Sequence, residues 1–358
     1  MYKKFYNLIP TKKSIADDSI YLLSDTEIKY IKNKEYFAVF LSAAIGVIMV
    51  LALYLPQYYW PALFPENIFI IPFFNETFSF SVIGFVYGML LVFIEIVLLT
   101  FLNIYCAHEI AFATGFINSD NKNQADKKNI LLKIANEKKD KEIITLGIDP
   151  YSGLNKKTVI LFNLFFTLKA TLSNMFFKLL VQRVLGRYAL RQVMDMLGIP
   201  VFAFWNAWGT QKVLRQARVI IMGQNYLNHF NADLHNFRKL TDNEKTTLYD
   251  TLQFIAESKR DYHQNHFHLS KLIIEHFQIE TQKKHSLQEK YFLNLKNSDE
   301  DFKALNEKII LLGFVLDGEL SSREKKRFNV LKKENITNKT IPQLKLLLTN
   351  FLNGKGLN

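Results

Sequence analysis

The sequence contains one cysteine, Cys106, so the chain cannot form an internal disulfide. Because Cys106 follows an apolar segment, we expect a small buried hydrophobic residue there rather than a reactive thiol. No Lys or Arg occurs between Lys34 and Lys122. Elsewhere bases are in excess, and the formal net charge is +12. Such an excess is typical of proteins that contact nucleic acid or an anionic membrane surface.

The sequence also lacks the motifs of common catalytic and cofactor sites. It has no P-loop, no G-x-S-x-G elbow, no H-E-x-x-H helix and no Cys/His set at zinc-ligand spacing. We therefore predict that the protein is not an enzyme and uses no cofactor. Nucleic acid is not an expected partner, because no known reader motif is present.

Two long apolar segments predict membrane-spanning helices. Residues 36–55 carry no charge, and residues 80–104 carry only Glu95. A helix of about 20 residues is about 30 Å long, which matches the hydrocarbon thickness of a bilayer. The flanks of both segments are rich in lysine, whereas the connecting loop is aromatic and has no cation. The positive-inside rule therefore predicts that both termini lie in the cytoplasm and that the loop lies outside. Together with the resemblance to bacterial membrane-associated proteins given below, this implies a bacterial inner (cytoplasmic) membrane protein.

Small residues in these spans predict close helix packing. Gly84 and Gly88 form a G-x-x-x-G motif, and Ser42 with Gly46 offers a small face on the first span. Close backbone approach favours pairing of helices in lipid, within the chain or between copies. The alternative is chance, because glycine is common in membrane helices.

Glu95 lies deep in the second span, where a charged carboxylate costs about 2.5–3.5 kcal/mol on insertion scales. Either this residue stays protonated or it meets a polar partner. A single carboxylate is no ion pathway, so transport is a minor alternative.

The middle of the chain combines apolar and cationic character. Between Lys156 and Arg218 there are ten cations and one acid, Asp195. Residues 158–185 predict an apolar helix with a cationic face, which suits an interfacial position in a membrane. A soluble helical core with a basic rim is the alternative. The cations expected to contact anionic inner-leaflet lipids are Lys169, Lys178, Arg183, Arg187 and Arg191.

Residues 197–209 are apolar but too short to span a bilayer. Pro200 and Gly209 are residues that commonly interrupt a helix. We therefore predict a buried or re-entrant hairpin here. Residues 186–223 resemble the core of EcsC-like bacterial membrane-associated proteins, which share a basic helix, a G-x-P apolar stretch, an Asn and a helix with A-R. The resemblance implies membrane association with a transporter-linked or regulatory role and no catalytic residues. The matching positions are Arg191, Gly198, Pro200, Asn206, Ala217 and Arg218.

The last third of the chain predicts amphipathic helices and no strands. Thr241 and Glu244 predict a capping box at the start of one helix. Residues 310–331 resemble the repeated unit of TerB-like (tellurite-resistance-type) helical modules, in which an apolar helix ends in D-G and a capped helix follows. Residues 254–277 resemble the same unit more weakly, because they lack the D-G. The corresponding positions are Asp317, Gly318, Ser321 and Glu324, where Gly318 allows a left-handed turn and Ser321 with Glu324 caps the next helix.

Two groups of residues in this part are weak candidates for metal binding. His263, His266 and His268 are close in sequence, but a solvated loop explains them more simply. Asp317, Glu319 and Glu324 could gather a cation, but helix capping explains them without one.

The sequence therefore predicts an all-α membrane protein with two transmembrane helices, amphipathic or re-entrant membrane-associated helices and a C-terminal soluble helical bundle. The expected function is a membrane-anchored, cytoplasmic-facing scaffold or regulatory protein that binds the inner leaflet and a protein partner or a second copy. Alternatives are a non-catalytic subunit of a transport or secretion complex and a metal- or stress-responsive module. The predicted segments are 1–35 (cytoplasmic), 36–55 (span), 56–79 (external loop), 80–104 (span), 105–155 (polar linker), 156–230 (EcsC-like) and 231–358 (TerB-like).

Overall fold

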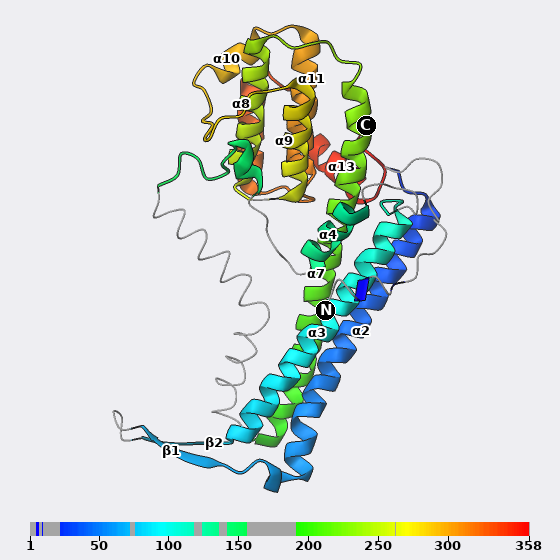
Figure 1. The fold of residues 1–358 in the computed structure, drawn as a ribbon, viewed down its shortest axis with the longest axis vertical. Coiled ribbons are helices and arrows are strands. Elements are labelled where there is room, and N and C mark those ends of the chain that lie inside the picture. Colours follow the sequence, from blue (N-terminus) through cyan, green and yellow to red (C-terminus); the bar gives the residue numbers. More distant parts are fainter. Residues whose placement is uncertain are drawn as a thin grey trace. The chain divides into compact units, whose positions relative to one another are not determined.

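A computed structural model describes residues 5–6, 9, 22–71, 76–117, 124–135, 142–155, 191–261 and 263–357. Helices make up most of this part of the chain, as the all-α prediction requires (Figure 1). The elements, in order, are α2 (Asp25–Tyr59), η1 (Pro61–Leu63), β1 (Asn67–Ile71), β2 (Glu76–Phe80), α3 (Val82–Ala113), α4 (Gln124–Ala135), η2 (Glu142–Leu146), α7 (Arg191–Leu234), α8 (Asp242–Lys259), α9 (Gln264–Phe277), α10 (Tyr291–Lys296), α11 (Glu300–Val315), α12 (Ser322–Lys333) and α13 (Ile341–Leu352).

The chain forms two compact units, and α2, α3 and α7 each contain residues of both. Unit 1 comprises Met1–Pro10, Asn33–Cys106 and Leu161–Leu214. Unit 2 comprises Thr11–Lys32, Ala107–Ile160 and Arg215–Asn358. This division differs from the predicted segments, in which residues 105–155 were a linker. In unit 2 that stretch contributes Ile143 and Ile148, which are 2% and 0% exposed, to the hydrophobic core.

The helices α2 and α3 are long and apolar enough to cross a membrane. The helix α2 extends beyond the predicted span 36–55 at both ends, whereas α3 starts at Val82, just after the predicted start of 80–104, and extends beyond its end. A capping box fixes the start of α2, because the Glu27 carboxylate accepts from the backbone N–H of Ser24 at 2.7 Å and the Ser24 hydroxyl accepts from the Glu27 N–H at 3.3 Å. The helix α3 ends at Ala113, and Gly115 follows it with a φ of +66°, the left-handed conformation typical of the residue after a helix end.

A two-stranded antiparallel hairpin lies between α2 and α3, and the sequence did not reveal it. Strands β1 and β2 pair with Asn67 opposite Phe80 and Ile71 opposite Glu76. Their sequences, NIFII and ETFSF, are rich in the β-branched and aromatic residues that favour extended structure. The predicted external loop therefore has regular structure of its own.

The helix α7 corrects the hairpin predicted for residues 197–209. It runs without interruption for 44 residues, and Pro200 lies inside it. A proline within a helix removes one backbone hydrogen bond but its φ remains helical, so the helix continues. A Cβ added at Gly209 would have nothing within 4 Å, so no close approach or turn requires glycine there.

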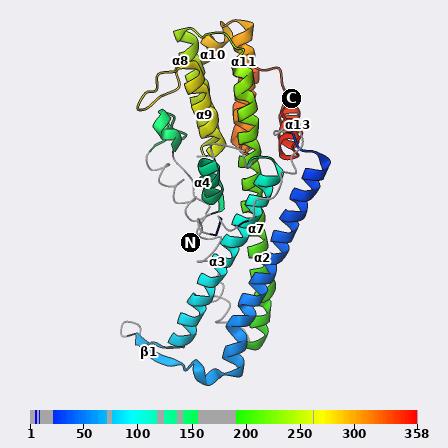
Figure 2. The same ribbon diagram turned by 45° about the vertical axis from the view of Figure 1, so that its right-hand side comes forward.

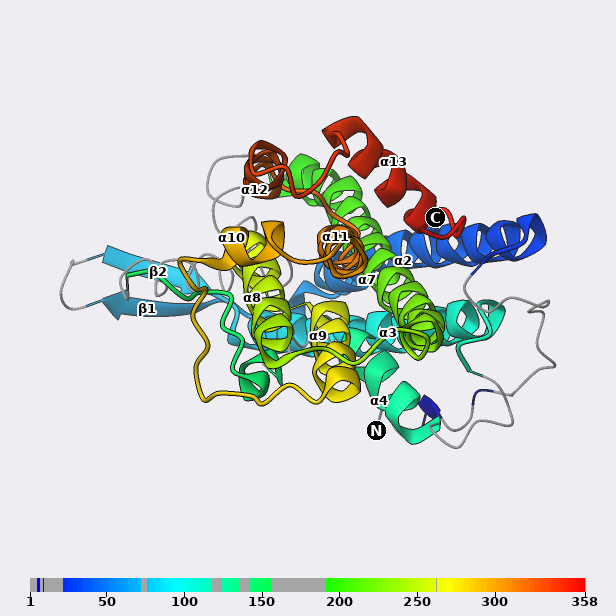
Figure 3. The ribbon, with the colours of Figure 1, turned by 90° about the horizontal axis from the view of Figure 1, so that it is seen from above.

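In unit 2, α11 lies among α8, α9, α12 and α13 (Figure 3). The predicted capping boxes are both present, Thr241 with Glu244 at α8 and Ser321 with Glu324 at α12. The predicted left-handed turn is also confirmed, because Gly318 has a φ of +76°. The sequence therefore predicted the starts of these two helices correctly.

Candidate functional site: a buried polar pair beside a cavity in unit 1

Three helices build the site in unit 1. Within this unit α2, α3 and α7 run side by side (Figures 1 and 2). The Tyr87 hydroxyl of α3 donates to the Ala52 carbonyl of α2 at 2.7 Å. The helix α7 approaches α2 closely at Gly46, where an added Cβ would lie 3.0 Å from the carbonyl oxygen of Phe202 and 2.9 Å from Nδ2 of Asn206.

The central feature is a hydrogen bond between Glu95 of α3 and Asn206 of α7. Asn206 Nδ2 donates to Glu95 Oε1 at 2.6 Å. Both side chains are buried, with 3% and 4% of their surface exposed. Of the two alternatives for Glu95, the structure therefore shows a polar partner, the amide of Asn206. The sequence singled out both residues separately, but nothing in it linked positions 111 residues apart.

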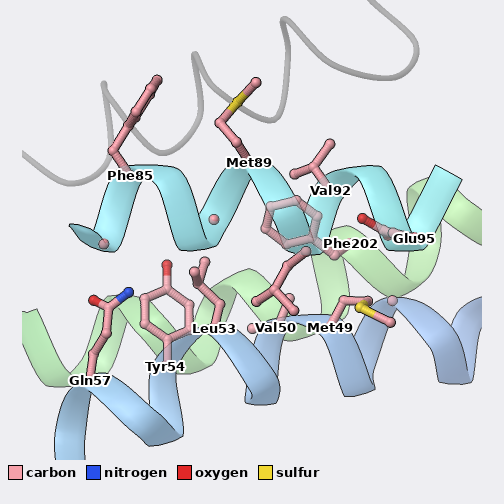
Figure 4. A pocket seen from close by; sticks show the side chains of 14 residues that line it. Met49, Val50, Leu53, Tyr54, Gln57, Phe85, Met89, Val92, Glu95 and Phe202 are labelled. Atoms are coloured by element: carbon pink, nitrogen blue, oxygen red, sulfur yellow. The ribbon is translucent and has the colours of Figure 1, made fainter. Parts of the chain in front are cut away.

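A cavity of about 180 Å³ lies beside this pair. Glu95 and Met49 lie at one end of the row of lining side chains, and Gln57 and Tyr54 lie at the other (Figure 4). Between them the lining is apolar, with Val50 among its members. The cavity is therefore mostly hydrophobic with polar groups at its two ends, an arrangement common to small-molecule sites.

The glycines predicted to pack helices have different surroundings. Gly46 is tightly opposed to α7, as described above. Gly84 and Gly88 line the cavity. A Cβ added at Gly88 would meet Leu53 Cδ1 at 3.6 Å, an ordinary contact, so this glycine leaves space rather than allowing backbones to touch. Ser42 is buried, and its hydroxyl donates to the Val39 carbonyl of its own helix at 2.8 Å.

Most of the predicted lipid-binding residues lie outside the described part of the chain. These are Lys169, Lys178, Arg183 and Arg187. Arg191 is the first residue of α7, and its side chain is not described. Lipid contact by these five residues stays a prediction.

Unit 2 contains a second buried group of charges, at the positions predicted as weak metal candidates. The Lys259 ammonium donates to Asp317 Oδ1 at 2.7 Å, to the Phe314 carbonyl at 2.9 Å and to the Glu319 carbonyl at 3.1 Å. It also pairs with the Glu324 carboxylate, and its own side chain is only 1% exposed. The Lys259 ammonium therefore occupies the position between the carboxylates that a metal ion would take. Glu319 binds this ammonium through its backbone carbonyl and not through its carboxylate. Within the described ranges, no three His, Cys, Asp or Glu side chains are placed to hold a metal.

The two carboxylates of this cluster have pKa values shifted in opposite directions. Burial alone would raise the pKa of Asp317, but Lys259 and the nearby His266 and His263 outweigh it and lower that pKa. Burial raises the pKa of Glu324, and the neighbouring Asp317 adds to this effect. The charged form is therefore favoured at Asp317 by Lys259 and disfavoured at Glu324 by burial.

The histidines differ from the predicted solvated loop. His263 caps the start of α9, and its side chain accepts from the Asn265 N–H. His266 lies inside α9, is 2% exposed, and its Nε2 lies 2.9 Å from the Gly313 carbonyl. Burial lowers the pKa of His266 to about 3, so its ring is neutral and donates this hydrogen bond. The loop prediction was wrong because a histidine can serve as a cap or as a satisfied core residue.

No protein-family model matches the chain, and the searches of curated proteins and of solved structures also find no match. The resemblances to EcsC-like and TerB-like proteins consequently stay predictions.

Proposed function

We propose that the protein is a membrane-anchored scaffold or regulatory protein whose α2 and α3 cross the bacterial inner membrane and whose unit 2 meets a protein partner in the cytoplasm. The exposed surface of the two helices supports insertion. Phe40 is 75% exposed and Phe93 is 64% exposed, with further large apolar side chains exposed along both helices. Contiguous apolar surface of this kind marks contact with lipid or with another protein.

The observation that carries the orientation is that unit 2 contains both the start of α2, with Lys29 and Lys32, and the end of α3, after which Lys122, Lys127 and Lys128 follow. Tyr30 near the start of α2 hydrogen-bonds to the Glu109 carboxylate near the end of α3. The Leu23 N–H donates to the Gly354 carbonyl at 2.9 Å, which joins the start of α2 to the C-terminal residues. Since no cation lies between Lys34 and Lys122, the positive-inside rule assigns these ends to the cytoplasm.

Engaged charges in unit 2 favour a binding role over a catalytic one. Lys259 is surrounded by its partners, and the buried Asp250 accepts from His285 Nε2 at 2.8 Å. The His285 ring also stacks on Tyr249, with the ring centroids 3.9 Å apart. These side chains hold the elements of unit 2 together. A unit held rigidly in this way can offer a fixed surface to a binding partner.

Cysteine labelling tests the orientation. After Cys106→Ser, a single cysteine placed at Leu63 should react with a membrane-impermeant maleimide in intact cells. A cysteine at Glu300, an exposed residue of unit 2, should react only after the inner membrane is opened. Labelling of position 300 from outside would refute the orientation.

Purification of the full chain in mild detergent should recover a stoichiometric partner, and a chain that elutes alone as a monomer would argue against a scaffold.

A second candidate is a non-catalytic subunit of a transport or secretion complex. The observation that favours it is the cavity beside the buried Glu95, because ionisable residues within membrane helices commonly line the routes of substrates. Copurification with other membrane subunits would distinguish this candidate from a scaffold for cytoplasmic proteins. In either case the predicted contact of Lys169, Lys178, Arg183, Arg187 and Arg191 with anionic lipids would add to the attachment.

A further inference from the structure

We propose that α12 of unit 2 docks an acidic helix of the cytoplasmic protein partner through four lysines that have no charge partner within the described part of the chain. This inference deepens the proposed function and rests on it for the existence of that partner. We call the four residues the lysine face of α12. They are Lys325, which is half-buried, and the exposed Lys326, Lys332 and Lys333.

The first support is the concentration of uncompensated positive charge on one helix. The helix α12 contains six cations and a single acid, Glu324. That acid is buried and already bound to Lys259. Glu334, at the end of α12, binds Lys296 at 2.6 Å. Among the described residues, no carboxylate forms an ion pair with the lysine face, so its attraction for negative charge is available to a second molecule.

The second support is the contrast with other lysines of unit 2. Four of them each lie between 2.6 and 3.7 Å from a carboxylate of the same unit. We call them the paired lysines, and they are Lys271, Lys296, Lys303 and Lys308. Their charges are used within unit 2, whereas the lysine face leaves a field of one sign at the surface.

The third support is that a firmly packed helix presents the lysine face. Phe328 and Leu331, on the other side of α12, are fully buried, and the Phe328 ring packs edge-on against Phe314 of α11. The capping box of Ser321 and Glu324 fixes the start of the helix. Within unit 2, α12 lies at the outer edge of the group that it forms with α8, α10 and α11 (Figure 3). Charges on a fixed helix need less ordering when a partner binds.

The spacing of the lysines favours a helix as the occupant. Lys325 and Lys332 are seven residues apart, and so are Lys326 and Lys333. Seven residues of helix rise about 10.5 Å, so the four lysines form two parallel rows along α12. Carboxylates seven residues apart on a second helix have the same separation, and matched rows of this kind select partners in paired helices. The expected partner therefore carries adjacent Asp or Glu residues that recur every seven positions.

Lipid and nucleic acid fit the lysine face less well. A helix that binds a membrane surface inserts an apolar face into the lipid, but Phe328 and Leu331 of α12 are buried in unit 2. Proteins that bind single-stranded nucleic acid offer aromatic side chains on which bases stack. The one aromatic residue of α12 is the buried Phe328.

The test uses the full chain purified in mild detergent at low ionic strength, where screening of charges is weak. The probe is a fluorescent helical peptide of three heptads with two adjacent glutamates in each heptad, and its binding is measured by fluorescence anisotropy. Three unlabelled competitors are compared with it. They are a scrambled peptide of the same composition, a single-stranded RNA of similar charge and the short-chain anionic lipid dihexanoyl-phosphatidylglycerol.

Two quadruple variants change the net charge equally. One replaces the whole lysine face by glutamine, and the other replaces the four paired lysines by glutamine. We expect the heptad peptide to bind the lysine-face variant about 30-fold more weakly than the native chain, and the paired-lysine variant within about threefold of it. Binding to the native chain should weaken as salt is added. The lysine-face variant should melt as the native chain does, because it loses no ion pair.

Equal weakening in the two variants would overturn the inference, because net charge alone would then account for binding. It would also be overturned if the scrambled peptide, the RNA or the lipid competed as well as the unlabelled heptad peptide, or if the heptad peptide did not bind at all.

These outcomes are distinct from a failure of the proposed function. A partner that copurifies equally with the native chain and the lysine-face variant would leave the scaffold standing and refute the site on α12. Labelling of position 300 from outside, or a chain that elutes alone, would refute the proposed function while the heptad peptide still bound to α12.

Discussion

Two carboxyl groups that are largely shielded from solvent, one in each unit, are held in place by different chemistry. In unit 2, Asp317 is paired with the Lys259 ammonium, which also binds two backbone carbonyls. In unit 1, Glu95 is held by the neutral amide of Asn206 and lies beside a cavity. The Lys259 ammonium is a charged partner that also binds backbone carbonyls, whereas the Asn206 amide is a neutral donor to one carboxyl oxygen. The first arrangement joins α8 to the residues that follow α11, and the second joins α3 to α7.

This difference predicts unequal costs of removing each partner. A buried charge that loses its counter-ion is strongly destabilised, by about 3–5 kcal/mol. A buried acceptor that loses a neutral donor costs less, about 1–3 kcal/mol. The following experiments measure that gap.

The largest effect is expected for Lys259→Met. The substitution keeps most of the apolar stem but strands Asp317 and Glu324, so we expect a loss of about 3–5 kcal/mol, measured by thermal melting of the full chain in detergent. The remaining ligands would be two carboxylates and two carbonyls, all hard oxygen donors. Millimolar Ca²⁺ should therefore restore part of the lost stability in the variant and none in the native chain.

Lys303→Met is the control for this substitution. Lys303 pairs with Glu300 at 2.8 Å, but Glu300 is 89% exposed, so water screens the pair. Its loss should cost no more than about 1 kcal/mol. Equal effects of the two substitutions would show that Lys259 does not stabilise unit 2 through its charge.

Gly46→Ala should have the next largest effect. Its methyl group would lie 3.0 Å from the Phe202 backbone carbonyl, which cannot move without shifting α7. Overpacking of this kind costs about 1–3 kcal/mol. Gly88→Ala is the matched change, since its methyl group finds only an ordinary contact and alanine favours the helix by up to about 1 kcal/mol. Melting temperatures that fall equally in both variants would contradict the view that only Gly46 is a packing glycine.

The sequence predicted helices and caps well because these depend on nearby residues. The capping boxes at Thr241 and Ser321 and the turn at Gly318 each follow from residues within a few positions. The Glu95–Asn206 pair and the Lys259 cluster could not be predicted in this way, because each joins residues far apart in the chain. The continuity of α7 was missed for a different reason. Pro200 is a usual sign of a helix end, but here α7 continues through it from Arg191 to Leu234.

Asn206→Leu should cost about 1–2 kcal/mol, less than Lys259→Met, because one neutral donor is lost from a buried acceptor. The double variant Glu95→Leu with Asn206→Leu should recover part of this cost, since both groups of this hydrogen bond are removed together. Glu95→Gln should be tolerated, because a glutamine carbonyl still accepts from Asn206. A loss above 3 kcal/mol in Glu95→Gln, measured by melting in detergent, would instead indicate a cationic partner for Glu95.

The smallest effect concerns acid and the histidine beside the Lys259 cluster. Burial lowers the pKa of His266 to about 3 in the folded chain, so the unfolded chain takes up a proton first as the pH falls below about 6.5. Stability from this group is thus complete at neutral pH and decreases on acidification, by roughly 1 kcal/mol between pH 7.5 and 5.5. Asp317 acts in the same direction at lower pH, because a lowered carboxyl pKa gives stability that is lost as the pH falls through it. Glu324 acts in the opposite direction, since burial raises its pKa.

His266→Gln keeps an amide donor for the Gly313 carbonyl, and we expect its melting temperature to fall less than that of the native chain between pH 7.5 and 5.5. All other histidines are common to both proteins, so identical pH profiles would mean that His266 is not held neutral by burial in unit 2.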